Sequence, residues 1–156
     1  MDQKLGPYPS PAAKRQWAAN STSPMMAFQS GELTTNATGV PLGAANIGGN
    51  ISDVWISVGR SGKDDSNTLS LTVDVKINGT TCLSTAPVIA HVSGEASTNK
   101  TTKNDSDTGV TVRALDADNI SVSQGDIITY DMTLTRTPSP TTEMANLAVV
   151  VEIEPV

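Results

Sequence analysis

The chain has 156 residues, a formal net charge of −6 and a single cysteine. This length supports one domain with a substantial core. The acidic balance argues against a nucleic-acid binder, which carries a basic patch, and one thiol cannot form an internal disulfide. No apolar run approaches the roughly 20 residues of a membrane span, and the first residues lack an apolar signal region, so we expect neither a membrane partner nor a secretory signal.

Residues 1–30 are expected to form an extended N-terminal arm, and residues 31–156 a β-sandwich domain. Four prolines between positions 7 and 24 keep most of the arm extended. Residues 1–28 carry three basic side chains and one acidic one, a balance of 3 − 1 = +2, which leaves −6 − 2 = −8 for the remainder. We expect the arm to bind its own domain, a sister subunit or a different protein through Lys4, Tyr8, Lys14, Arg15, Trp17 and Phe28.

Alternation of apolar and polar residues predicts strands along the rest of the chain. The clearest is residues 69–77, and residues 33–38 make a weak edge strand followed by a glycine-rich loop. No stretch shows a sustained helical period, and β-branched residues dominate the apolar set, so the domain is all-β. Eight or nine strands fit a two-sheet antiparallel jelly roll or a related sandwich. The remaining strands are expected at residues 51–59, 80–85, 88–92, 110–114, 120–122, 128–135 and 147–153.

The Asn78–Gly79 pair predicts a tight two-residue hairpin turn of type I′. A strict two-residue turn places Cys82 opposite Val75 in the core and Leu83 outside, whereas a bulge at the glycine would reverse them. Residues 93–108 are long, polar and without pattern, and they are therefore predicted to form a mobile surface loop.

Catalytic chemistry finds little support in the sequence. His91 is the only histidine and has no second candidate base, so we expect a structural or exposed role. Cys82 is expected to act as a small core hydrophobe. Known nucleophile, zinc and phosphate-loop motifs do not occur, so we expect neither an enzyme nor a cofactor. The alternative, a hydrolase working through carboxylates, would depend on Asp105, Asp107 or Asp118.

Metal and sugar binding are the two remaining ligand classes. Residues 104–109 and 116–119 cluster oxygen ligands in loops, as calcium sites do, but neither completes the EF-hand spacing. We therefore expect no metal, with calcium as the open alternative. Stacking on a sugar is disfavoured, because Trp55 and Tyr130 are the only aromatic residues outside the arm and Tyr130 belongs to a core-facing set.

Two segments carry a resemblance to a known class of proteins. Residues 69–89 read Leu-Ser-Leu-Thr-Val-Asp-Val-Lys-Ile-Asn-Gly-Thr-Thr-Cys-Leu-Ser-Thr-Ala-Pro-Val-Ile, and residues 123–131 read Ser-Gln-Gly-Asp-Ile-Ile-Thr-Tyr-Asp. They resemble the β-sandwich domains of tailed-bacteriophage virion proteins, namely head decoration (cement) proteins, head fibres and tail-fibre modules. The resemblance covers residues 51–155 and departs at residues 144–147, where members often begin the last strand with Gly-Leu. Residues 1–50 have no counterpart.

The resemblance implies a jelly-roll-like domain in a homotrimer on the capsid surface of a virion, with the major capsid protein as its partner. Together with the arm, it leads to a hypothesis: a capsid decoration protein that bridges neighbouring capsid subunits and stabilises the head. The rival is a head- or tail-fibre module that binds a host receptor or glycan through loops at residues 60–67 and 93–108.

Overall fold

The computed structural model describes residues 22–64 and 68–156, and the regular structure in this part of the chain is entirely β-strand. In chain order, these residues form β1 (Ser23–Glu32), β2 (Ala37–Ala44), β3 (Gly49–Arg60), β4 (Ser70–Ile77), β5 (Thr80–Thr81), β6 (Leu83–Thr85), β7 (Val88–Ala90), β8 (Lys100–Thr101), β9 (Val110–Thr111), β10 (Ala114–Leu115), β11 (Ser121–Val122), β12 (Ile127–Thr135) and β13 (Ala145–Glu154). None of the described residues belongs to a helix that could cross a membrane.

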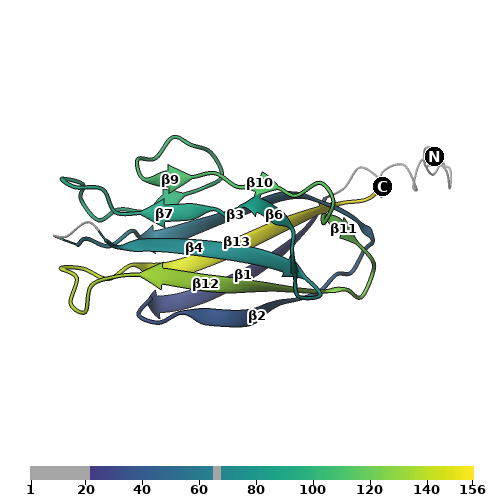
Figure 1. Ribbon diagram of the computed structural model, residues 1–156, viewed down its shortest axis with the longest axis horizontal. Helices are drawn as coiled ribbons and strands as arrows, with labels where there is room; N and C mark the ends of the chain where they lie inside the picture. The colour runs from purple at the N-terminus through teal and green to yellow at the C-terminus, as the bar shows by residue number, and fades with distance from the viewer. Residues whose placement is uncertain (1–21, 65–67) are drawn as a thin grey trace, which may run out of the picture.

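Two antiparallel sheets pack against each other as a sandwich (Figure 1). Sheet A has the order β1-β13-β3-β11, with β8 also paired to β3, and sheet B has the order β2-β12-β4-β7-β9, with β5 paired to β4. Strands pair from the two ends of this part of the chain inward: β1 with β13, β2 with β12, β3 with β8 and β4 with β7. That nesting is the jelly-roll arrangement, and it confirms the predicted fold class.

The core lies between the sheets and follows the alternation of the four central strands. Each buried aliphatic side chain stabilises the fold by roughly 1.5–3 kcal/mol, and β-branched side chains suit the pleated surface. The prediction that Tyr130 faces the core is confirmed, since its side chain is 2% exposed. The inward-facing residues of β3, β4, β12 and β13 are Ile51, Val54, Ile56, Val58, Leu71, Val73, Val75, Ile77, Ile128, Tyr130, Met132, Leu134, Leu147, Val149, Val151 and Ile153.

The hairpin after β4 has the strict two-residue turn. Asn78 and Gly79 have φ values of 48° and 88°, as a type I′ turn requires, and the Cys82 N–H donates to the Val75 carbonyl at 3.0 Å. Cys82 is therefore in the core, but Leu83 is buried as well, at 7% exposure. The strand breaks between β5 and β6, and β6 leaves sheet B to pair with β10. The alternation that predicted an exposed Leu83 stops at this break.

The segment predicted as a patternless mobile loop, residues 93–108, is anchored to the sandwich. It contains β8, which pairs with β3, and the side chain of Lys100 is only 4% exposed. The Lys100 Nζ donates to Glu95 Oε2 at 2.7 Å and to the carbonyls of Thr108 and Ala90 at 2.6 and 3.2 Å. Because a buried ammonium must be paired, these three acceptors fix the loop around it.

The predicted boundary between arm and sandwich, at residue 30, needs correction. β1 begins at Ser23 and pairs with β13 in continuous register from Ser23 to Gln29. Pro24 is compatible with this strand because β1 is at the edge of sheet A, where proline is tolerated. Residues 23–30 are therefore part of the sandwich, and Phe28 lies on a strand of it.

Candidate functional site

The outer face of sheet A, turned away from the core, carries the largest exposed apolar side chains of β1. Met26 and Phe28 are each 64% exposed. They lie two residues apart, so they share the outer face of the strand, while Met25 and Ala27 pack against the core. Single exposed apolar side chains are common on protein surfaces and do not by themselves mark a function. Phe28 differs from Met26 in that it lines a hollow on this face.

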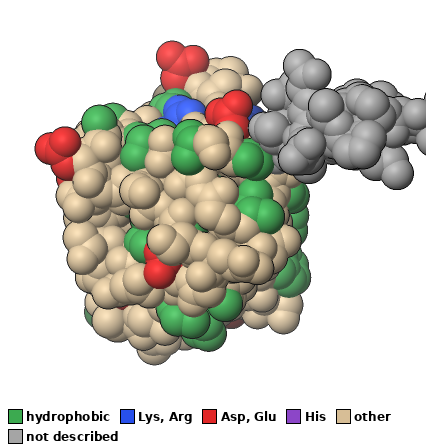
Figure 2. All heavy atoms as spheres, turned by 90° about the vertical axis from the view of Figure 1, so that its right-hand side faces the viewer, with side chains coloured by type: hydrophobic (Ala, Val, Ile, Leu, Met, Phe, Trp, Pro, Cys, Tyr) green, Lys and Arg blue, Asp and Glu red, His purple; other side chains and the backbone are tan. Residues whose placement is uncertain are grey.

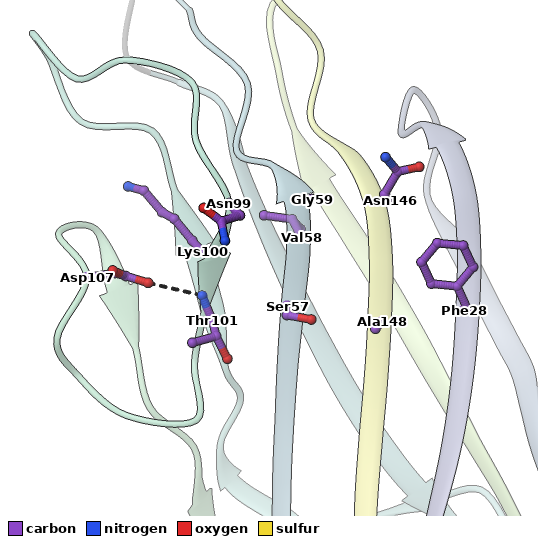
Figure 3. A pocket seen from close by; sticks show the side chains of 10 residues that line it. All are labelled: Phe28, Ser57, Val58, Gly59, Asn99, Lys100, Thr101, Asp107, Asn146 and Ala148. Atoms are coloured by element: carbon purple, nitrogen blue, oxygen red, sulfur yellow. Dashed lines mark hydrogen bonds between the residues drawn. The ribbon is translucent and has the colours of Figure 1, made fainter.

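A hollow lies beside Phe28 on this face, and small side chains create it. Phe28 is opposite Ala148, Ala148 is opposite Ser57, and Ser57 is opposite Thr101, so one row of residues crosses four strands. Cross-strand partners project to the same side of a sheet. Ala148 and Ser57, on the two central strands, are shorter than their neighbours, and Gly59 has no side chain. We call this depression of about 470 Å³ the sheet A hollow (Figure 3).

The rim of the hollow carries uncharged polar side chains. Asn99 and Ser57 line the hollow, and neither side chain forms a hydrogen bond with another described residue. Asn146, whose φ of 61° lies in the left-handed region, accepts a hydrogen bond from the Gly31 N–H at its Oδ1, at 2.9 Å. A Cβ at Gly59 would lie 3.1 Å from the Asn146 Cβ, a tight contact that Asn146 would have to relieve by a small shift.

Two charged groups border the hollow, and both are engaged. Asp107 Oδ2 accepts from the Thr101 N–H at 3.1 Å. The Lys100 side chain points away from the hollow (Figure 3), toward its three acceptors. Its hydrogen bond also lowers the pKa of Glu95 below the ordinary carboxyl value. The hollow therefore offers hydroxyl and amide groups without an unpaired cation.

Trp55, on the same outer face, is covered. The Lys103 Nζ lies 3.7 Å from the centre of its ring, and the same ammonium pairs with Asp53 Oδ2 at 2.6 Å. Arg113 pairs with the other oxygen of Asp53, also at 2.6 Å. Cation and carboxylate hold each other in place over the indole, which leaves Phe28 as the open ring on this face.

Two of the residues considered for catalysis, His91 and Cys82, are buried in the sandwich. His91 is buried at 5% exposure, and its Nδ1 has no hydrogen-bond partner. Cys82 is fully buried, and burial raises the pKa of its thiol to about 12, so it stays protonated at neutral pH. Among the described residues, no group of three His, Cys, Asp or Glu side chains could hold a metal ion.

The predicted contact residues divide into two sets. Phe28 is exposed on β1, and the other five, Lys4, Tyr8, Lys14, Arg15 and Trp17, lie outside the described residues. Sequence reasoning missed the polar rim of the hollow, Ser57, Asn99 and Asn146; the alternation in β3 and β13 was the only signal that placed Ser57 and Asn146 on the outer face.

Comparison of the chain with protein-family models, curated proteins and solved structures found no match.

Proposed function

We propose that this protein is a bacteriophage capsid decoration protein, which binds the outer surface of the head and stabilises it. In this proposal a homotrimer anchors to the major capsid protein through residues 1–21, which bridge neighbouring capsid subunits. The observation that carries the proposal is the contrast in charge between residues 1–21, with a balance of +2, and the rest of the chain, with −8. The resemblance of residues 51–155 to virion proteins supplies the class of partner.

The geometry of the sandwich supports an anchor at one end. Ser23, the first residue of β1, lies opposite Ile153 near the end of β13. Residues 1–21 therefore join the sandwich at the end where β13 finishes, which we call the terminal end. Figure 2 looks onto this end and shows a surface that is mostly uncharged, with scattered apolar side chains and few acidic ones. Few charged groups would have to lose water if another protein covered this end.

The composition of residues 1–21 suits an anchor. Their balance is +2, from Lys4, Lys14 and Arg15 against Asp2, while the rest of the chain carries −8. Opposite charge on a partner surface would set the register of binding. Tyr8 and Trp17 are aromatic anchors of the kind that dominate interface energies. Fully extended, 21 residues would reach about 70 Å.

Pelleting with capsids tests the anchor. Undecorated heads are mixed with the wild-type chain or with a double variant, Tyr8→Ala with Trp17→Ala, and the bound fraction is measured after sedimentation. We expect saturable binding of the wild type and a loss of affinity of about a thousandfold in the double variant, because each lost aromatic anchor costs about 2 kcal/mol. Met26→Ala, an exposed apolar change within the sandwich, is the matched control and should bind as the wild type does. Wild-type chain that stays in the supernatant would contradict the proposal.

A further inference from the structure

We propose that the sheet A hollow binds an uncharged oligosaccharide. This inference stands on the geometry of β1, β13, β3 and β8 and does not depend on the anchoring role of residues 1–21. Three features carry it: an exposed aromatic ring, polar side chains without partners among the described residues, and a lining in which these residues place no unpaired cation.

Phe28 supplies the apolar contact. Its ring is 64% exposed and stands beside Ala148, which is too short to cover it. Figure 3 shows the Phe28 ring and the Asn99 side chain on opposite sides of the hollow. A pyranose has one face of C–H groups, and that face can pack on an aromatic ring while its hydroxyl groups reach polar neighbours. The expectation that no ring was free for stacking depended on assigning Phe28 to the arm, and its position on β1 removes that premise.

The polar groups suit hydroxyl recognition. Ser57 and Asn99 each carry both a donor and an acceptor, and neither forms a side-chain hydrogen bond with the described residues. The Asn146 Oδ1 is held by the Gly31 N–H, so its Nδ2 group remains as a donor. Sugar hydroxyls donate and accept, so they can satisfy all three side chains at once.

Charge favours an uncharged ligand over an anionic one. Lys100 is the basic residue that lines the hollow, and its ammonium is buried and satisfied by three acceptors. Asp107 adds a carboxylate at the rim, which repels phosphate, sulfate or an acidic sugar.

The dimensions also fit. Four paired strands, about 4.8 Å apart, place Phe28 and Thr101 on opposite edges of a hollow roughly 14 Å wide. Its volume of about 470 Å³ lies within the range of roughly 300–1,000 Å³ that is typical of small-molecule sites. An open site of this width accommodates a short linear oligosaccharide lying across the strands.

Amide chemical shifts of the full chain test the proposal and locate the ligand. Cellobiose, maltotriose, lactose and N,N′-diacetylchitobiose are each titrated to millimolar concentration against the ¹⁵N-labelled protein. We expect at least one of them to shift the amides of Ser57, Gly59, Thr101 and Ala148 in a saturable way. A panel in which no sugar moves these amides, or moves only amides elsewhere, overturns the proposal.

Two substitutions on β1 separate a sugar site from a general apolar surface. Phe28→Ala is expected to raise the dissociation constant about tenfold or more, equivalent to about 1.4 kcal/mol, while Phe28→Trp retains binding. Met26→Ala is the matched control, since Met26 has the same exposure but does not line the hollow, and it should leave the constant unchanged. Equal losses in Phe28→Ala and Met26→Ala would show a nonspecific apolar contact and contradict the sugar site.

The two proposals fail separately. A protein that binds sugar but does not pellet with heads removes the anchoring role and leaves the hollow as a saccharide site. If the protein pellets normally with heads but no sugar shifts its amides, the sugar site is ruled out and the anchoring role stands.

Discussion

At the residue scale, Lys100 shows how one side chain can order a segment that has no pattern in its sequence. Its ammonium is almost fully buried, and Glu95 and two backbone carbonyls surround it. Burial of a lysine is favourable only when such partners are present. Backbone pairing with β3 holds β8 against sheet A, and Asn99 and Thr101 shape one side of the hollow.

Replacing Lys100 tests this role. Lys100→Met keeps most of the apolar stem but leaves Glu95 and two carbonyls without their donor, so we expect the free energy of unfolding in urea to fall by about 2–3 kcal/mol. Lys103→Met is the matched control. Lys103 is 44% exposed, so its contacts with Trp55 and Asp53 are solvent-screened and should contribute less than about 1 kcal/mol. Equal losses in the two variants would show that Lys100 has no special structural role.

At the element scale, the turn between β4 and β5 is the most strongly specified feature of the chain. Gly79 has a φ of 88° with no heavy atom near its missing Cβ, so a side chain there would meet backbone strain rather than a clash. Asn78 ties the turn to β12, since its Oδ1 accepts from the Ile127 N–H at 2.9 Å and its Nδ2 donates to Asp126 at 2.9 Å.

A glycine substitution measures the backbone contribution of this turn. Gly79→Ala forces alanine into the left-handed region and should lower the free energy of unfolding by about 1–2 kcal/mol. Gly48→Ala provides the comparison, because Gly48 lies outside that region and its nearest neighbour would be at an ordinary 3.5 Å; we expect a change within about 0.5 kcal/mol. If urea unfolding gives the two variants the same stability, the turn does not need the left-handed conformation.

The strands that sequence predicts well are those with one buried face. In β4 and β12 the alternation fixes which residues face the core, and all of those positions are buried. The predictions failed where burial depends on a distant partner. Residues up to 30 were expected to form an extended arm, and residues 39–44 a glycine-rich loop, yet they belong to β1 and β2. Both strands are at sheet edges, where Pro24 and Pro41 are tolerated without an N–H. The loop at residues 93–108 gave no pattern, because one buried lysine holds it.

The hollow could be anticipated only in part. Alternation places Ser57 and Ala148 on the outer face, but it does not reveal that these positions are neighbours. That adjacency comes from the jelly-roll pairing of β13 with β3 and of β3 with β8. Phe28 was assigned to the arm because prolines precede it, and the local sequence contains no signal for its pairing with Ala148, 120 positions later.

At the scale of the whole molecule, the two proposed sites lie toward opposite ends of the sandwich. Residues 1–21 join it beside Ile153 at the terminal end. The hollow lies toward the other end, where β3 finishes at Arg60 and β13 begins at Ala145. A protein anchored to a capsid by its first residues would therefore present the hollow away from the anchor. This arrangement lets a head protein carry a sugar site facing outward without changing its attachment.

The most direct test of the account is the thermal rupture of phage heads. Undecorated, DNA-filled heads are heated alone, with the full chain, or with a protein of residues 22–156, which retains every described strand. DNA release is followed with a fluorescent dye. We expect the full chain to raise the rupture temperature, whereas residues 22–156 should leave it at the value of undecorated heads. A full chain that leaves the rupture temperature unchanged, or a shortened protein that protects equally well, would contradict it.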